Sequence, residues 1–99
     1  MSRRWIESRR KLVNAFFMAL GSYIEQEAKK GDEWREQSIG QIYAHLSHEV
    51  EEIRRNLKRG ERELLIHNCI DAVMLATMLL AKVAEQEGLL DKENLEEKA

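Results

Sequence analysis

The sequence predicts an all-α protein built as an antiparallel helical bundle. Three observations support this fold class. The 99 residues contain no proline and only five glycines, so the composition does not interrupt long helices. Apolar residues recur at spacings of three and four, the pattern of amphipathic helices. Short connections between the expected helices favour antiparallel neighbours. A chain of this length forms one domain, residues 1–99.

The first helix is expected over about residues 4–30. Lys29 and Lys30 followed by Gly31 and Asp32 predict its end, because basic residues favour a last turn and glycine ends a helix. Its apolar positions are Trp5, Leu12, Val13, Phe16, Phe17, Leu20, Ile24 and Ala28.

The second helix is expected to begin at Ser38, a plausible N-cap, and to end at Lys58 or Arg59, with Gly60 closing it. Glu49 and Glu52 flank its apolar stripe. The stripe expected to face the core comprises Ile39, Ile42, Tyr43, Leu46, Val50, Ile53 and Leu57.

The third helix is expected over about residues 61–87, with Gly88 as its stop. From residue 69 to residue 84 it is apolar nearly all round, and a helix without a polar face is surrounded by protein. Two other helices cannot surround it, so the sequence predicts a homodimer that completes the bundle, and such dimers could pair into a tetramer. A short C-terminal helix is expected from Leu89, docked by Leu89, Leu90 and Leu95.

The composition narrows the class of protein. An apolar fraction of 43% with 34% charged residues indicates a folded, soluble chain, and a net charge of −2 offers no general attraction to nucleic acid. The single cysteine, Cys69, suits a reducing cytoplasm. Asp71 and Lys82 interrupt the longest apolar stretch, so we expect no membrane span and a cytoplasmic location.

The basic start of the chain raises the alternative of a nucleic-acid-binding helical module, which salt-dependent DNA binding would support. No groove-reading motif accompanies these residues, so we expect no nucleic-acid partner. The basic residues are Arg3, Arg4, Arg9, Arg10 and Lys11.

Three carboxylates and an amide are the candidate metal ligands. Glu49 and Glu52 are three residues apart and share one helix face, as do Asn68 and Asp71 on the next helix. Asp71 lies in an apolar run, where a carboxylate is costly unless it is paired or metal-bound. Oxygen ligands of this kind suit Mg2+, with Mn2+ as an alternative ion. The competing interpretation is that they are ordinary solvated residues.

Histidines offer a second metal hypothesis. His48 and Glu52 are four residues apart, as are His67 and Asp71. If both pairs turned inward, they could bind Zn2+ or another transition metal.

Residues 30–84 resemble the MazG-like nucleotide pyrophosphohydrolases of the all-α NTP pyrophosphatase superfamily. The family pattern is E-E-x-x-E on one helix and E-x-x-D on the facing helix. Here it reads His48-Glu49-Val50-Glu51-Glu52 and Asn68-Cys69-Ile70-Asp71. The other matching segments are residues 31–34, 38–39, 45–53, 58–61 and 68–73.

The resemblance implies a Mg2+-dependent enzyme that cleaves nucleoside triphosphates between the α and β phosphates, giving monophosphate and pyrophosphate, in a house-cleaning role. Glu49, Glu52 and Asp71 would be metal ligands, with Asn68 at the fourth position. Asn68 and His48 stand where the family has glutamates. Because Asn68 removes a negative charge from the ion's ligands, we expect weaker metal binding than in a four-acid member.

The expected substrate contacts follow from this hypothesis. Glu49 and Glu52 are equal candidates for orienting the attacking water. Arg55 and Lys58, beside Arg54 and Arg59, could bind phosphates, although a solvated basic helix end explains any one of them. Lys82 could reach a phosphate, a partner acid or only water, and Trp34 could stack on a base or cap the bundle.

An alternative function remains open. The chain could be a catalytically impaired MazG-like homodimer that binds nucleotide or a protein partner. Asn68→Glu should raise hydrolysis strongly in an enzyme and change little in an impaired relative.

Overall fold

The protein is all-helical over the residues that its computed structural model describes, which are 2–30 and 33–90, with the side chains of 27–30 left undescribed. The elements are α1 (Arg3–Lys30), a 3-10 turn η1 (Glu33–Glu36), α2 (Ile39–Arg59) and α3 (Arg62–Gln86). The predicted all-α class and the three long helices are confirmed, whereas the predicted bundle and its completion by a second copy stay predictions. The sequence did not predict η1.

Local capping explains where α2 begins. Ser38 Oγ accepts a hydrogen bond from the Gln41 backbone N–H at 3.1 Å, and Gln41 Oε1 accepts one from the Ser38 N–H at 2.8 Å. This reciprocal pair satisfies two backbone donors that a helix start leaves free. The N-cap predicted at Ser38 is confirmed.

Gly60 joins α2 to α3 in a tight hairpin. Its φ of 68° lies in the left-handed region, which a side chain disfavours. The backbone N–H groups of Gly60 and Glu61 both donate to the Asn56 carbonyl and so close the helix end. The predicted end of α2 at Arg59 is confirmed, and the short turn makes α3 run back along α2.

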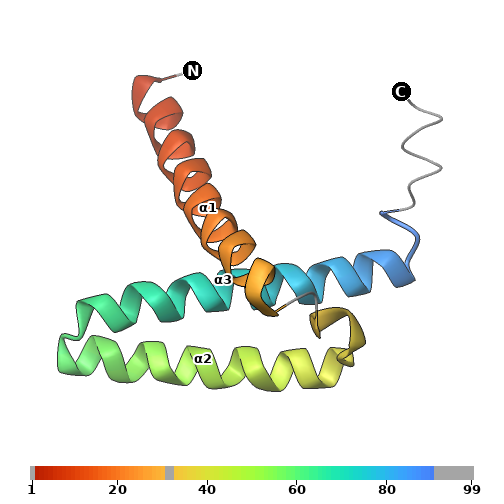
Figure 1. Ribbon diagram of the computed structural model, residues 1–99. Coiled ribbons are helices and arrows are strands. Elements are labelled where there is room, and N and C mark those ends of the chain that lie inside the picture. The colour runs from red at the N-terminus through yellow and green to blue at the C-terminus, as the bar shows by residue number, and fades with distance from the viewer. Residues whose placement is uncertain (1, 31–32, 91–99) are drawn as a thin grey trace.

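α2 and α3 lie antiparallel along most of their length, whereas α1 crosses α3 steeply and its N-terminal half stands away from both (Figure 1). The core is correspondingly small. It consists of Ala19, Ile42, Met74, Leu75 and Ala84. The radius of gyration is 16.1 Å, against about 12.6 Å for a compact domain of this length. A single chain therefore does not form a closed bundle.

The apolar stripe predicted for α2 is partly wrong. Tyr43, Val50 and Leu57 are mostly exposed, whereas Glu49 and Asn56 are buried. The reason is tertiary: α3 lies against the line through Ile42, Glu49 and Asn56, which are seven residues apart, and α1 does not cover the neighbouring face.

The end of the chain leaves one prediction open. Leu89 and Leu90 follow α3 in a turn and are exposed, so they do not dock onto the helices of this chain. The predicted C-terminal helix, including Leu95, lies otherwise in 91–99, outside the described residues.

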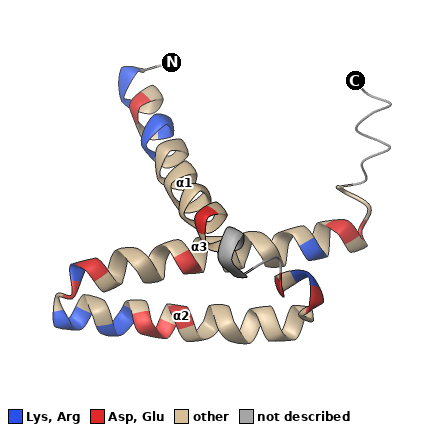
Figure 2. Cartoon of the chain, in the orientation of Figure 1, with Lys and Arg blue, Asp and Glu red and all other residues tan. Residues whose placement is uncertain are grey.

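α3 is, by length and composition alone, apolar enough to cross a membrane, the one such helix found in the described part of the chain. Core helices of soluble proteins meet the same criterion. Here α3 carries Asp71 and Lys82 and packs against α2 (Figure 2). The expected absence of a membrane span stays a prediction.

Candidate functional site

Glu49 is the buried acid of the α2–α3 interface. It is 8% exposed, although it is a glutamate on a two-helix hairpin. Its Oε1 lies 3.7 Å from His45 Nε2, one turn earlier on α2. Its Oε2 is buried without a hydrogen-bond partner in the described part of the structure. An unsatisfied buried acceptor of this kind costs about 1–3 kcal/mol, so its position favours a cationic ligand.

Glu52 lies at the edge of the same interface and already has cationic neighbours. Its Oε1 accepts a hydrogen bond from Arg55 Nη1 at 2.9 Å and lies 3.9 Å from His48 Nε2. Its side chain is only half-buried. Glu52 is therefore accessible to a ligand once it releases Arg55, and an exposed ion pair of this kind contributes only about 0–1 kcal/mol.

Asn68 contacts α2 directly. Its Nδ2 donates a hydrogen bond of 2.7 Å to Oδ1 of Asn56, which is buried. This hydrogen bond places Asn56 of α2 beside Asn68 of α3, so positions along the two antiparallel helices can be counted from this pair. At 1.5 Å per residue, Glu52 lies about 6 Å and Asp71 about 4.5 Å beyond this pair in the same direction. Glu52 and Asp71 are thus nearly level, and Glu49 lies about one turn further along α2.

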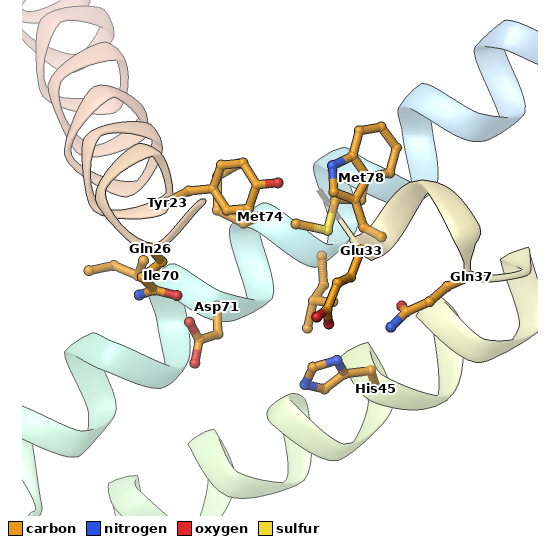
Figure 3. Close-up of a pocket in the computed structure, with 11 residues that line it drawn as sticks. Tyr23, Gln26, Glu33, Gln37, His45, Ile70, Asp71, Met74 and Met78 are labelled. Carbon is orange, nitrogen blue, oxygen red and sulfur yellow. The ribbon is translucent and has the colours of Figure 1, made fainter. Parts of the chain in front are cut away.

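Asp71 faces a pocket of about 280 Å3 formed where α1, η1, α2 and α3 meet. In Figure 3 the carboxylate of Glu33 lies above the imidazole of His45 and points toward it, and Asp71 lies to one side on α3. Eleven residues line the pocket: Tyr23, Gln26, Glu33, Trp34, Gln37, His45, Ile70, Asp71, Met74, Leu75 and Met78. Trp34 is thus part of the pocket wall, in which no described residue is a lysine or arginine, and its contact with a base stays a prediction.

His45 lies between the pocket and Glu49. It lines the pocket, and its Nε2 lies beside the Glu49 carboxylate. Sequence reasoning considered the i, i+4 pairs of His48 and His67 but not this one. The same spacing would have found the His45–Glu49 pair. The other new lining residues come from different elements, so no spacing in the sequence could have joined them.

The basic end of α2 lies toward the hairpin, beyond the carboxylates (Figure 2). Arg55 and Lys58 are both exposed there. Arg54 donates two hydrogen bonds to Glu51 Oε1, at 2.9 Å from Nε and 2.6 Å from Nη2. This contact holds the pKa of Glu51 below its ordinary value and raises that of Arg54.

Lys82 has a contact that the sequence did not suggest. Its Nζ donates to the Arg35 backbone carbonyl at 2.9 Å and so fastens η1 to α3. Because η1 carries Glu33 and Trp34, Lys82 supports the pocket wall. This contact does not place it on a phosphate.

The predicted metal ligands approach one another without closing around one point. Among the described residues, no three histidine, cysteine, aspartate or glutamate side chains are grouped closely enough to hold a metal ion. The absence applies both to the acids expected to bind Mg2+ and to the His48–Glu52 and His67–Asp71 pairs considered for Zn2+. The Glu49 Oε2, which has no partner among the described residues, is an oxygen ligand of the type that hard cations prefer.

Comparisons with family models, with curated proteins and with solved structures found no significant match for this chain.

Proposed function

We propose that the protein is a Mg2+-dependent, MazG-like nucleoside triphosphate pyrophosphohydrolase that releases monophosphate and pyrophosphate. The observation that supports this most is the buried Glu49, whose Oε2 has no partner in the described structure and which faces the helix carrying Asn68 and Asp71. A buried carboxylate oxygen without a partner lowers the stability of the fold. A cation bound between the helices would offset its cost.

The order of groups along α2 fits a nucleotide laid lengthwise on the hairpin. The pocket beside His45 comes first, the carboxylates Glu49 and Glu52 follow, and the exposed Arg55 and Lys58 come last. His45 to Glu52 spans about 10.5 Å of helix, and Glu52 to Lys58 about 9 Å. The base would occupy the pocket, the α phosphate would lie at the carboxylates, and the outer phosphates would lie at the basic end.

The pocket fits a nucleoside better than phosphates. Among the described residues no lysine or arginine lines it, and Glu33 and Asp71 would repel an anion. Trp34 and Tyr23 offer aromatic surface, and Glu33 can accept a hydrogen bond from an amino group of a base. A volume near 280 Å3 is at the low end for ligand sites, so the triphosphate would extend outside it.

The burial of each residue suggests whether it would bind the metal ion or act on the attacking water. Bound Mg2+ would neutralise phosphate charge and orient the substrate. The ion would be held by Glu49, Asp71 and Asn68. Asn68 would bind it through Oδ1, because its Nδ2 donates a hydrogen bond to Asn56. Glu52, which is more accessible, is the better candidate for accepting a proton from the attacking water.

We propose that the working form is a cytoplasmic homodimer, with tetramer formation open. Support comes from the large apolar side chains that one chain leaves exposed, among them Phe17, Val50 and Leu80. Isolated chains rarely leave so much apolar surface in water.

A second function has one specific observation in its favour. The Asn68–Asn56 hydrogen bond gives Asn68 a structural task, which suits a catalytically impaired relative that binds nucleotide without cleaving it. Asn68→Glu separates the two functions. The family's acid should raise hydrolysis strongly in an enzyme, whereas an impaired relative should stay inactive.

The direct test is pyrophosphate release from a panel of ribo- and deoxyribonucleoside triphosphates with Mg2+ or Mn2+. We expect turnover of at least one substrate, a loss of more than about 100-fold for Glu49→Gln, and little change for Glu51→Gln, the exposed neighbour. Absence of release across the panel by folded protein would reject the enzyme. Equal loss in both variants would reject the special role of Glu49.

A further inference from the structure

One face of α3 carries an unbroken apolar seam that stays exposed in the described part of the chain. Its six residues follow a heptad repeat, and each is exposed in the single chain. Leu80, at 68% exposure, is the most open of its four large side chains. This α3 seam consists of Ile66, Cys69, Val73, Ala76, Leu80 and Val83.

The α3 seam lies roughly opposite the face that packs within the chain. Asn68 and Lys82, which bond to α2 and η1, mark that inner face together with the buried Leu75. At 100° per residue the centre of the seam lies about 130° around the helix from these positions. A partner can therefore bind the seam without displacing α2 or the pocket.

Side-chain size selects the direction of pairing. In the heptad, Ile66, Val73 and Leu80 occupy a positions, and Cys69, Ala76 and Val83 occupy d positions. In an antiparallel pair a positions face d positions, so Cys69 meets Leu80 of the partner subunit and Val73 meets Ala76 of the partner subunit. Each layer then joins a larger side chain to a smaller one. A parallel pair would place small on small and leave gaps.

Charge favours the same direction. Arg62 lies four residues before the start of the α3 seam, and Glu87 lies four residues after its end. Both are exposed and continue the heptad pattern. In the antiparallel register Arg62 faces Glu87 of the partner subunit, whereas a parallel pair would place like charges together. The charged residues of α3 inside the seam's span, Asp71 and Lys82, lie on the inner face, so nothing on the seam repels a second copy.

The exposed area is large enough for such an interface. The chain exposes 8231 Å2, about 2,400 Å2 more than the roughly 5,800 Å2 expected for a folded chain of this mass. A standard interface takes about 800 Å2 from each partner.

We propose that two copies of the chain associate through the α3 seam, with α3 antiparallel to α3 about a two-fold axis level with residues 74 and 75. The pairing is isologous, because every contact occurs twice. It does not depend on the proposed activity, and it needs neither nucleotide nor metal.

Cysteine cross-linking tests the register, since Cys69 is the only cysteine of the chain. The antiparallel pair keeps the two Cys69 thiols about 16 Å apart along the helix, so mild oxidation should leave the wild type uncross-linked. Leu80→Cys should give disulfide-linked dimers between Cys69 and position 80 of the partner subunit. Leu57→Cys, equally exposed on α2, is the matched control and should give none. A Cys69–Cys69 disulfide in the wild type, or cross-linking by Leu57→Cys alone, would overturn the register.

Sedimentation equilibrium tests the association itself, without nucleotide or metal. The wild type should be dimeric at micromolar concentration. Ala76→Arg, at the centre of the α3 seam, should raise the dissociation constant more than about 100-fold, because two unpaired charges would be buried. Leu57→Arg should not, and circular dichroism should show that both stay helical. A monomeric wild type, or one that binds phosphatidylcholine vesicles only as a monomer, would overturn the proposal.

Discussion

Replacing Glu49 with leucine should make the protein more stable and abolish its activity. The wild-type carboxylate is 8% exposed, and its Oε2 is buried without a partner in the described structure. Removing that oxygen recovers about 1–3 kcal/mol of desolvation cost, against less than about 1 kcal/mol for the 3.7 Å contact with His45. We expect the free energy of unfolding to rise by about 1–2 kcal/mol and Tm by about 4–16 °C.

The assay is thermal and chemical unfolding without divalent ions at one fixed protomer concentration, since the stability of a dimer depends on that concentration. Glu51→Leu is the matched control on the same helix, where the acid is exposed, and it should change stability by less than about 0.5 kcal/mol. A Glu49→Leu protein that is less stable than the wild type would show that the carboxylate is satisfied in the fold. The argument for a cation at Glu49 would then fail.

Three further predictions concern the supporting contacts. Asn68→Ala should lower the free energy of unfolding by about 1–3 kcal/mol in urea titrations, because it leaves the buried Asn56 oxygen without its donor; a loss below about 0.5 kcal/mol would refute that contact. Lys82→Met should raise KM for the nucleotide and leave kcat nearly unchanged, because it frees η1 from α3; a fall in kcat at constant KM would instead place Lys82 in the chemistry. The pKa of Glu51 should lie below its ordinary value in an NMR titration and return to it in Arg54→Met. Because the folded pKa is lowered, the small stabilisation is present above the unfolded pKa and is lost as pH falls through the folded pKa; an unchanged pKa in the variant would contradict this.

The helix bounds could be predicted because their signals are local. Ser38 caps α2 through a residue three positions away, and Gly60 ends it by adopting a left-handed conformation. Neither depends on the rest of the fold. The turn η1 was missed because it is short, carries no periodic pattern, and is fastened by Lys82 from a distant helix.

The buried face of α2 could be predicted only in part. Periodicity alone allows either side of the apolar stripe to be covered. The position of α3 decided that Glu49 and Asn56 would be buried and that Val50 and Leu57 would be exposed. Sequence spacing therefore singled out Glu49 as a candidate site residue but placed it at the edge of the buried stripe.

The candidate site was predictable where its residues share a helix. Glu49 and Glu52 follow from one spacing, and the antiparallel hairpin brings Asn68 to α2, as the Asn56 contact shows. The pocket could not be predicted, because Tyr23, Glu33 and His45 come from three elements whose crossing no local pattern encodes.

Binding of Mn2+ followed by electron paramagnetic resonance tests the central claim most directly, because it requires neither the correct nucleotide nor turnover. The wild type should bind Mn2+ saturably, Mg2+ should compete for the same site, and Glu51→Gln should bind as well as the wild type. Glu49→Gln and Asp71→Asn should each lose this binding. Equal Mn2+ binding by the wild type and Glu49→Gln would contradict the account.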